Sequence, residues 1–227
     1  MNYSAIILSG GRGNRMQEAV PKQYLLLGGK PMIIHSIERM DKIETISEII
    51  IVCEESFIEP LKEMIHEYSI LKPVIFIEGG QTRQQSVYNG LKAAKEDSII
   101  LHEAARPFVR RSDFEALISN PNANVTLGYD IPFTVLTGTS KVQGILNRSE
   151  LINVQLPQKF NKRALLDAHE KAIKENLTYT EDASLLFDIS QEEISIQKGT
   201  SINIKITEPL DLELGEIIYK NHIINRK

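Results

Sequence analysis

Short apolar runs alternate with amphipathic helical patterns along much of this 227-residue chain. The apolar runs have the length of buried strands and cover residues 4–9, 48–52, 74–78 and 98–102. Apolar residues recur at helical spacing between them, in residues 33–40 behind Pro31, in 57–68 and in 83–94. Strands joined by crossover helices run parallel, with helices on both faces of the sheet. The sequence therefore predicts an α/β fold with a doubly wound, mostly parallel sheet.

Glycines or polar residues follow three of these predicted strands. They are Gly10 and Gly11 after the first strand, Gly79 and Gly80 after the third, and His102 and Glu103 after the fourth. The carboxyl ends of parallel strands meet at one edge of the sheet, and ligands bind there. We therefore expect one binding site at that edge, with His102 serving as a structural hydrogen-bonding residue.

The segment after the first strand carries both glycines and cations. It reads S-G-G-R-G-N-R-M from Ser9 to Met16, and Lys22 follows behind Pro21. Glycines leave backbone N–H groups open to phosphate oxygens, and Arg15 and Lys22 add positive charge. The segment lacks the Walker sequence and the third glycine of the dinucleotide fingerprint. It predicts a triphosphate site, although glycines that only turn the chain are the simpler alternative.

Bulk properties exclude several classes of function. The length suits a single domain over residues 1–227. A net charge of −4 argues against a nucleic-acid-binding role. No run reaches the 18 or so apolar residues that cross a membrane, and the single cysteine, Cys53, forms no disulfide framework. We expect a cytoplasmic protein with a buried thiol at Cys53.

The second half of the chain has a different pattern. A turn at 120–122 and a strand at 125–131 lead into a polar, glycine-containing stretch with β-favouring residues. We interpret residues 134–155 as a projecting β-arm, with a plain surface excursion as the alternative. The last predicted elements are a helix over 161–175 capped by Asn161, a strand over 203–207, and a helix over 210–219 opened by Pro209.

Six motifs in fixed order resemble those of the cytidylyltransferases that act on 2-C-methyl-D-erythritol 4-phosphate in non-mevalonate isoprenoid synthesis. They are G-x-G-x-R-M (Gly11–Met16), P-K-Q-Y (Pro21–Tyr24), G-G-x-x-R-x-x-S-V-x-x-G-L (Gly79–Leu91), A-A-R-P (Ala104–Pro107), T-x-D-A-S (Thr180–Ser184) and N-I-K-I-T (Asn203–Thr207). Enzymes that act on ribitol 5-phosphate share the first motifs. The resemblance implies a Rossmann-like nucleotidyltransferase fold and a homodimer that exchanges its β-arms.

The resemblance also implies a reaction. An oxygen of the alcohol phosphate attacks the α-phosphorus of CTP, which releases pyrophosphate and forms a CDP-alcohol. Such transfers depend on positioning and on neutralising charge in the transition state. The family's catalytic cations fall on Arg15, Lys22 and Lys205 of this sequence.

The family's nucleotide-binding positions can be placed in the same way. They fall on Ser9, Gly10, Gly11, Gly13, Gly79, Gly80, Ser86 and Ala104. Of these, Gly80 and Ser86 would contact the cytosine, and Ala104 and Ala105 would pack beside it.

The acceptor-binding positions of the family fall on Glu103, Arg106, Arg148 and Thr180. Two arginines can hold a phosphate monoester. Through arm exchange, Arg148 and Thr180 would enter the neighbouring subunit's site. Glu103 stands where the family usually has aspartate, and it would either bind Mg²⁺ or another divalent cation, or contact the acceptor.

Two stretches near the acceptor positions depart from the family pattern. They are Pro132–Gly138 and Leu156–Gln158. Methylerythritol phosphate is our leading acceptor, and ribitol 5-phosphate or another alditol or sugar phosphate for teichoic acid or capsule synthesis is the alternative. A non-catalytic nucleotide-binding relative and a guanylyl- or uridylyltransferase remain as further alternatives.

Overall fold

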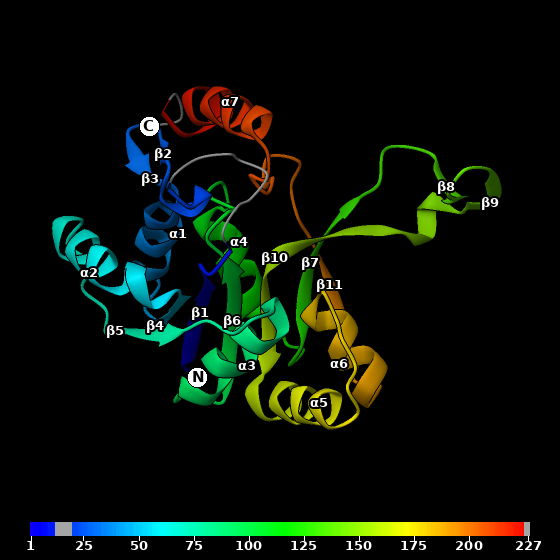
Figure 1. Ribbon diagram of the computed structural model, residues 1–227, viewed down its shortest axis with the longest axis horizontal. Helices are drawn as coiled ribbons and strands as arrows, with labels where there is room; N and C mark the ends of the chain where they lie inside the picture. Colours follow the sequence, from blue (N-terminus) through cyan, green and yellow to red (C-terminus); the bar gives the residue numbers. More distant parts are fainter. Residues whose placement is uncertain (12–19, 225–227) are drawn as a thin grey trace.

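A twisted sheet of seven strands forms the centre of the computed structural model, which describes residues 1–11 and 20–224 (Figure 1). Its strand order is β11-β7-β10-β6-β1-β4-β5. The strands are β1 (Tyr3–Leu8), β4 (Ile46–Cys53), β5 (Val74–Glu78), β6 (Ser98–Glu103), β7 (Val125–Asp130), β10 (Ile152–Asn161) and β11 (Ser195–Lys198). Strand β10 runs antiparallel to both neighbours, and the other pairings are parallel. The prediction of a mostly parallel α/β sheet is confirmed.

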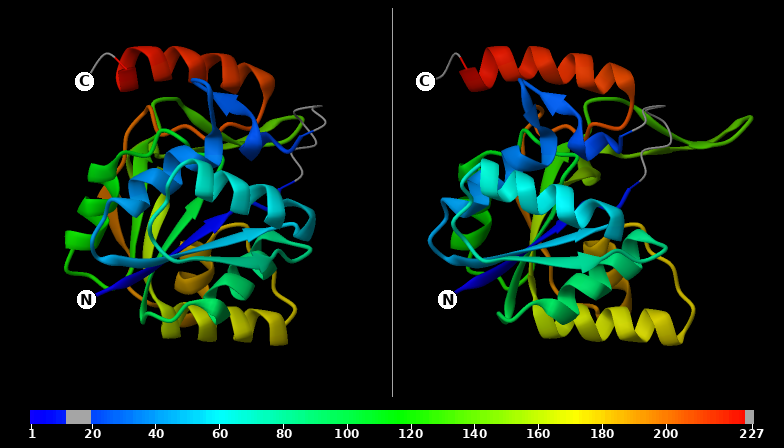
Figure 2. Two further views of the ribbon diagram at one scale, coloured as in Figure 1. Left: turned by 90° about the vertical axis from the view of Figure 1, so that its left-hand side faces the viewer. Right: turned by 60° about the vertical axis from the view of Figure 1, so that its left-hand side comes forward.

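Helices cover both faces of this sheet (Figure 2). One face carries α1 (Met32–Asp41), α2 (Ile58–Glu67) and α4 (Arg111–Ser119), and the other carries α3 (Arg83–Ala93), α5 (Lys162–Lys174) and α6 (Asp182–Ser190). The shorter helices are η1 (Lys22–Tyr24), η2 (Glu55–Phe57), η3 (Arg148–Glu150) and η4 (Tyr219–Ile224). None of the helices in the described ranges is both long and apolar enough to cross a bilayer.

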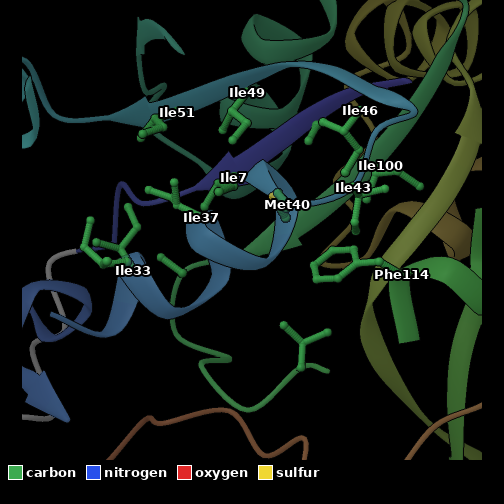
Figure 3. Packing of buried hydrophobic residues seen from close by; sticks show 14 of the residues in the cluster. Ile7, Ile33, Ile37, Met40, Ile43, Ile46, Ile49, Ile51, Ile100 and Phe114 are labelled. Atoms are coloured by element: carbon green, nitrogen blue, oxygen red, sulfur yellow. The ribbon is translucent and has the colours of Figure 1, made fainter. Parts of the chain in front are cut away.

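The central strands are apolar on both faces because each face is covered. In β1, Ala5 and Ile7 pack with α1, whereas Ile6 between them packs with α3 and α5 on the opposite face. Figure 3 shows Ile7 and Ile37 side by side in the first of these clusters. Burying one such isoleucine contributes about 1.5–3 kcal/mol. This two-sided burial explains the unbroken apolar runs in the sequence.

A third apolar cluster lies beyond the carboxyl ends of the strands. There, helix α7 (Pro209–Ile218) packs over Leu27, Met32, Phe108 and Ile206. The small sheet of β2 (Leu26–Leu27) and β3 (Lys30–Pro31) lies beneath it (Figure 1). Helix α7 and the small sheet thus form a layer that covers part of the region beyond the carboxyl ends of the strands.

The predicted strand over 203–207 is wrong. These residues form no strand, and the sheet edge that they could have extended is taken by β11, which pairs parallel with β7. The segment instead crosses the ends of the strands: the Ile206 amide donates to the Ala105 carbonyl at 2.8 Å, and the Asn203 side chain donates to the Leu156 carbonyl at 2.8 Å. The segment is thus held by separate hydrogen bonds rather than by the regular ladder of a strand.

A hairpin of β8 (Val135–Gly138) and β9 (Val142–Leu146) stands away from the central sheet (Figure 1). It occupies most of the stretch interpreted as a β-arm. Residues 152–155 at the end of that stretch belong to β10, where Ile152 pairs with Asp130. Large apolar side chains of the hairpin segment are exposed, namely Phe133, Leu136, Val142, Ile145 and Leu146.

Candidate functional site

A pocket of about 890 Å³ lies at the carboxyl ends of β1, β4, β5 and β6. Its walls are formed by Leu8, Ser9, Gly10, Gly11, Lys22, Gln23, Glu54, Glu55, Ser56, Glu78, Gly79, Gly80, Gln81, Thr82, Arg83, Ser86, Glu103, Ala105 and Lys205. The structure thus brings together most of the residues selected from sequence, from segments at both ends of the chain. Gly13 and Arg15 lie outside the described residues.

Ser9, at the start of the glycine segment, is fixed by three hydrogen bonds. Its amide donates to the Val52 carbonyl at 2.7 Å, and its hydroxyl donates to the Tyr24 hydroxyl at 3.0 Å. Gln23 donates to the Ser9 carbonyl at 2.5 Å. Tyr24 itself stacks on Phe57, and burial raises its pKa to about 12. The P-K-Q-Y motif therefore holds the glycine segment in place, a role that our sequence reasoning missed.

Gly10 and Gly11 leave the wall of the pocket open. Among the residues that the structure describes, a Cβ atom at either position would meet no atom within 4 Å. The absence of side chains therefore allows a ligand to approach the backbone closely. Lys22 lines the same pocket and begins η1. Burial works to raise the pKa of Asp211, but hydrogen bonds from Thr207 and Glu208 lower it, and the charge of Lys22 adds to that lowering.

The start of α3 holds the two residues predicted to contact the base. The Gly80 amide donates to the Ser86 hydroxyl at 3.0 Å, and this hydroxyl donates to the Thr82 carbonyl at 3.0 Å. Thr82 caps the helix by accepting from the Gln85 amide at 3.1 Å. Gly79 donates to the carbonyl of Cys53, whose buried thiol has its pKa raised to about 11 by desolvation. Capping and pocket formation thus use the same residues.

Glu103, the last residue of β6, lies among three cations. Its Oε1 accepts from Arg83 Nε at 3.0 Å, and its Oε2 lies 2.8 Å from Lys205 Nζ and 3.9 Å from Arg106 Nε. Burial alone would raise the pKa of this carboxyl, but Lys205, Arg83 and Arg106 together lower it to about 2. Glu103 is therefore ionised at neutral pH and organises positive charge at the pocket.

Arg83 extends this cluster away from the pocket. Its Nη1 donates to Asp182 Oδ2 at 2.5 Å, and Asp182 Oδ1 lies 3.2 Å from Nε2 of the fully buried His169. Our sequence reasoning assigned no role to Arg83 or Asp182. The available signal was that both are charged residues of opposite sign within the quoted motifs.

His102 has the structural role that we expected. It is fully buried and lies 3.1 Å from the Ser36 hydroxyl and 3.3 Å from the Arg106 carbonyl. Burial, followed by the charge of Arg106, lowers its pKa to about 3. The ring is therefore neutral at physiological pH and packs edge-on against Phe114.

Two acceptor candidates, Arg106 and Thr180, and the nucleotide-binding candidate Ala104 are not among the residues that line the pocket. Arg106 lies beside Glu103, and its Nη1 donates to the Asn203 carbonyl at 2.9 Å. Ala104 is buried behind the wall that Ala105 forms. Thr180 is exposed and lies two residues before Asp182.

Arg148 lies elsewhere in the chain. It borders a separate hollow of about 400 Å³ at the base of the hairpin, and its Nη1 donates to the Pro132 carbonyl at 3.0 Å. The described residues of one chain therefore do not bring Arg148 into the large pocket.

Comparison with known proteins identifies close relatives. Residues 3–221 match the family model described as IspD, 2-C-methyl-D-erythritol 4-phosphate cytidylyltransferase. The enzyme of that name from Geobacillus thermodenitrificans is 38% identical over 230 residues, covering 98% of this chain and 99% of that protein. Its namesake from Clostridium botulinum strain Loch Maree is 38% identical over 221 residues, covering 95% of this chain and 96% of that protein.

Solved structures of similar proteins have the same fold. The 4-diphosphocytidyl-2C-methyl-D-erythritol synthase of Anaerococcus prevotii superimposes with a TM-score of 0.84 at 26% identity, covering 96% of this chain and 98% of that chain. The 2-C-methyl-D-erythritol 4-phosphate cytidylyltransferase of Thermus thermophilus gives a TM-score of 0.80 at 26% identity, covering 97% and 100% of the two chains.

Proposed function

Because this chain belongs to the 2-C-methyl-D-erythritol 4-phosphate cytidylyltransferase family, we propose that it transfers the cytidylyl group of CTP to that polyol phosphate. A phosphate oxygen of the acceptor forms a bond to the α-phosphorus of CTP, and the bond from this phosphorus to the oxygen bridging to the β-phosphorus breaks. The products are a CDP-alcohol and pyrophosphate. The observation that carries this proposal is the pocket in which open glycine backbone, Lys22 and the Glu103 cluster face one space.

The triphosphate would lie against the segment that follows β1. Backbone amides of Gly10 and Gly11 can approach phosphate oxygens because these glycines carry no side chain of their own. Lys22 would neutralise charge on the triphosphate and on the leaving pyrophosphate. Arg15 and Gly13 belong to the same motif, and we propose the corresponding catalytic and nucleotide-binding roles for them.

The base would lie at the start of α3. Gly80 and Ser86 are already joined by a hydrogen bond, so the backbone there is fixed before the nucleotide arrives. Because this backbone would lie close to the base, we expect the space to fit a pyrimidine ring and to exclude the larger purine. We propose that Gly79, Gly80 and Ser86 contact the cytosine and that Ala104 packs behind it.

The acceptor phosphate would bind beside Glu103. Three cations, Lys205, Arg83 and Arg106, face Glu103. Arg83 also pairs with Asp182, so two carboxylates balance three cations and one positive charge is left uncompensated. A phosphate monoester supplies the missing negative charge. Lys205, whose side chain is 38% exposed, would then stabilise charge on the reacting phosphates.

A divalent cation is a further expectation for this chemistry. Within residues 1–11 and 20–224, no group of three or more His, Cys, Asp or Glu side chains could hold a metal ion. Both oxygens of Glu103 already face cations, at 3.0 Å and 2.8 Å. The described residues therefore do not fit a metal held by the protein alone, and we propose that phosphate oxygens of CTP provide most ligands for any Mg²⁺.

We further propose that the protein is a homodimer formed through the β8–β9 hairpin. An isolated two-stranded hairpin is marginally stable in water, and this one exposes Val142 and Ile145, at 68% and 74%. A second copy that covers these side chains would bury them. Arg148 and Thr180 would complete the acceptor site across that interface. We also propose a cytoplasmic location.

Pyrophosphate release by the purified protein tests the reaction. We expect turnover with CTP and methylerythritol phosphate, and little with UTP or GTP. Ribitol 5-phosphate and other alditol phosphates complete the acceptor panel. Turnover with one of these acceptors alone would refute the proposed acceptor, and nucleotide binding without turnover of any acceptor would refute the enzymatic role.

A further inference from the structure

Arg83 occupies an unfavourable position for a cation. It is the first residue of α3, where the helix dipole repels positive charge, and its side chain is only 24% exposed. Burial works against its charge, but Asp182 and Glu103 more than compensate and raise its pKa. Placement of an arginine there is explained by these two carboxylates rather than by the helix.

The guanidinium of Arg83 uses different nitrogens for the two carboxylates. Nε donates to Glu103 at 3.0 Å, and Nη1 donates to Asp182 at 2.5 Å. Arg83 therefore bridges two elements instead of binding one carboxylate in bidentate fashion. One of these elements is the end of β6 in the pocket, and the other is the start of α6.

Asp182 is a rigid anchor for its end of the bridge. It is 1% exposed, its other oxygen meets His169, and the preceding residue, Glu181, caps α6 by accepting from the amides of Ala183 and Ser184. Thr180 lies two residues earlier, so its Cα is within about 7 Å of that of Asp182. Holding Asp182 therefore also restrains the chain that carries Thr180.

We propose that Arg83 is a positioning residue for acceptor binding: it holds Glu103 in the site of its own subunit and, through Asp182, restrains the chain around Thr180, which would enter the neighbouring subunit's site. The inference rests on the proposed function, because it concerns how that acceptor binds. Without the bridge, Glu103 is restrained by fewer partners and pairs more freely with Lys205. The segment leading into α6 also loses its tie to the pocket.

The consequence is a loss confined to one substrate. The catalytic efficiency toward methylerythritol phosphate should fall on the order of 10- to 100-fold in Arg83→Gln, by analogy with the removal of groups that orient the ligands of a metal site. The CTP dissociation constant should stay within about twofold, because the side-chain hydrogen bonds of Arg83 are separate from those that fix Gly80 and Ser86. We would measure the first by steady-state kinetics and the second by calorimetric titration.

Three further variants make the test specific. Arg83→Lys keeps the charge but has one nitrogen, which cannot span both carboxylates, so its loss should resemble that of Arg83→Gln. Arg83→Gln/Asp182→Asn breaks the same bridge twice and should lose no more than Arg83→Gln alone. Arg110→Gln is the matched control, because Arg110 pairs with the buried Asp113 at the start of α4 outside the pocket.

Each result decides the inference. Wild-type acceptor kinetics in Arg83→Lys would refute the bridging role. A catalytic efficiency in the double variant well below that of Arg83→Gln would refute the shared bridge. An equal rise in the CTP dissociation constant would show a general structural role. If Arg83→Gln fails to fold because the buried Asp182 loses its arginine partner, the double variant removes both charges, and wild-type acceptor kinetics in that variant overturn the inference.

The wild-type protein in the same assay distinguishes a failure of the proposed function from a failure of the inference about Arg83. Absence of wild-type turnover refutes the proposed function and, with it, the acceptor role of Arg83. Normal wild-type turnover together with an unaltered Arg83→Gln variant refutes the role of Arg83 alone.

Discussion

Nζ of Lys205 lies 2.8 Å from Oε2 of Glu103, and this pair joins the segment before α7 to the end of β6. Lys205 is the more exposed partner, at 38% against 9% for the Glu103 side chain. The buried carboxylate thus holds the lysine at the mouth of the pocket. The Lys205 ammonium can therefore contact an incoming phosphate while it stays paired with Glu103.

Replacing Lys205 should impair the transfer step. We expect Lys205→Gln to lower kcat by about 10²–10³-fold, the usual effect of removing one group that stabilises transition-state charge. Lys198→Gln is the control, because Lys198 is 77% exposed and pairs with Asp130 outside the pocket. Steady-state rates of pyrophosphate release would test this, and an unchanged kcat in Lys205→Gln would contradict the role.

Glu103 should link stability to acidic pH. Its pKa is about 2 in the folded protein, below the ordinary value of 4.5. Ionised Glu103 therefore stabilises the fold fully above the ordinary pKa, and this contribution is lost as the pH falls from about 4.5 through about 2. We expect Glu103→Gln to show a shallower loss of unfolding free energy over that range, measured by urea denaturation.

Glu115→Gln provides the matched control for this pH dependence. Glu115 pairs with Arg111 on the exposed side of α4, and such surface pairs contribute about 0–1 kcal/mol. The pH profile of this variant should match that of the wild-type protein. A Glu103→Gln profile of wild-type slope would argue against the lowered pKa.

The Tyr24 hydroxyl should support nucleotide binding through Ser9. Tyr24→Phe removes the hydroxyl oxygen that accepts a hydrogen bond from Ser9 Oγ, 3.0 Å away, and leaves the ring stacked on Phe57. One such hydrogen bond contributes about 1 kcal/mol, so the CTP dissociation constant should rise about fivefold. Tyr68→Phe, at the end of α2 and outside the pocket lining, should bind CTP as the wild type does. Calorimetric titration measures both, and equal affinities would refute the link.

The exposed face of the hairpin should determine the oligomeric state. Ile145→Lys places a charge where Ile145 is now 74% exposed, and in a dimer it would be buried without a partner. We expect this variant to shift the mass found by sedimentation from dimer toward monomer. Leu71→Lys, at an equally exposed position outside the hairpin, should leave the mass unchanged. A wild-type monomer would refute the proposed dimer directly.

The central sheet could be predicted because its strands carry a local signal. β1 and β4 are buried on both faces, so each contains an unbroken apolar run, over residues 5–8 and 49–53. The segment 203–207 carries a similar apolar signal but forms no strand. Its apolar residues fill the space beneath α7, where Ile206 packs with Phe108, and local pattern does not distinguish this use from strand pairing.

The sequence by itself determined the α/β class, the gathering of site residues at the carboxyl ends of β1, β5 and β6, and, through its ordered motifs, the family. These follow from short-range periodicity and from residue types at fixed spacing. Only the tertiary structure decided that Arg83 joins Glu103 to Asp182, and that Lys205, from a segment near the end of the chain, meets Glu103 at the end of β6. Ion pairs between residues far apart in the sequence form only once the whole chain has folded and brought their segments together. A local sequence pattern therefore does not reveal them.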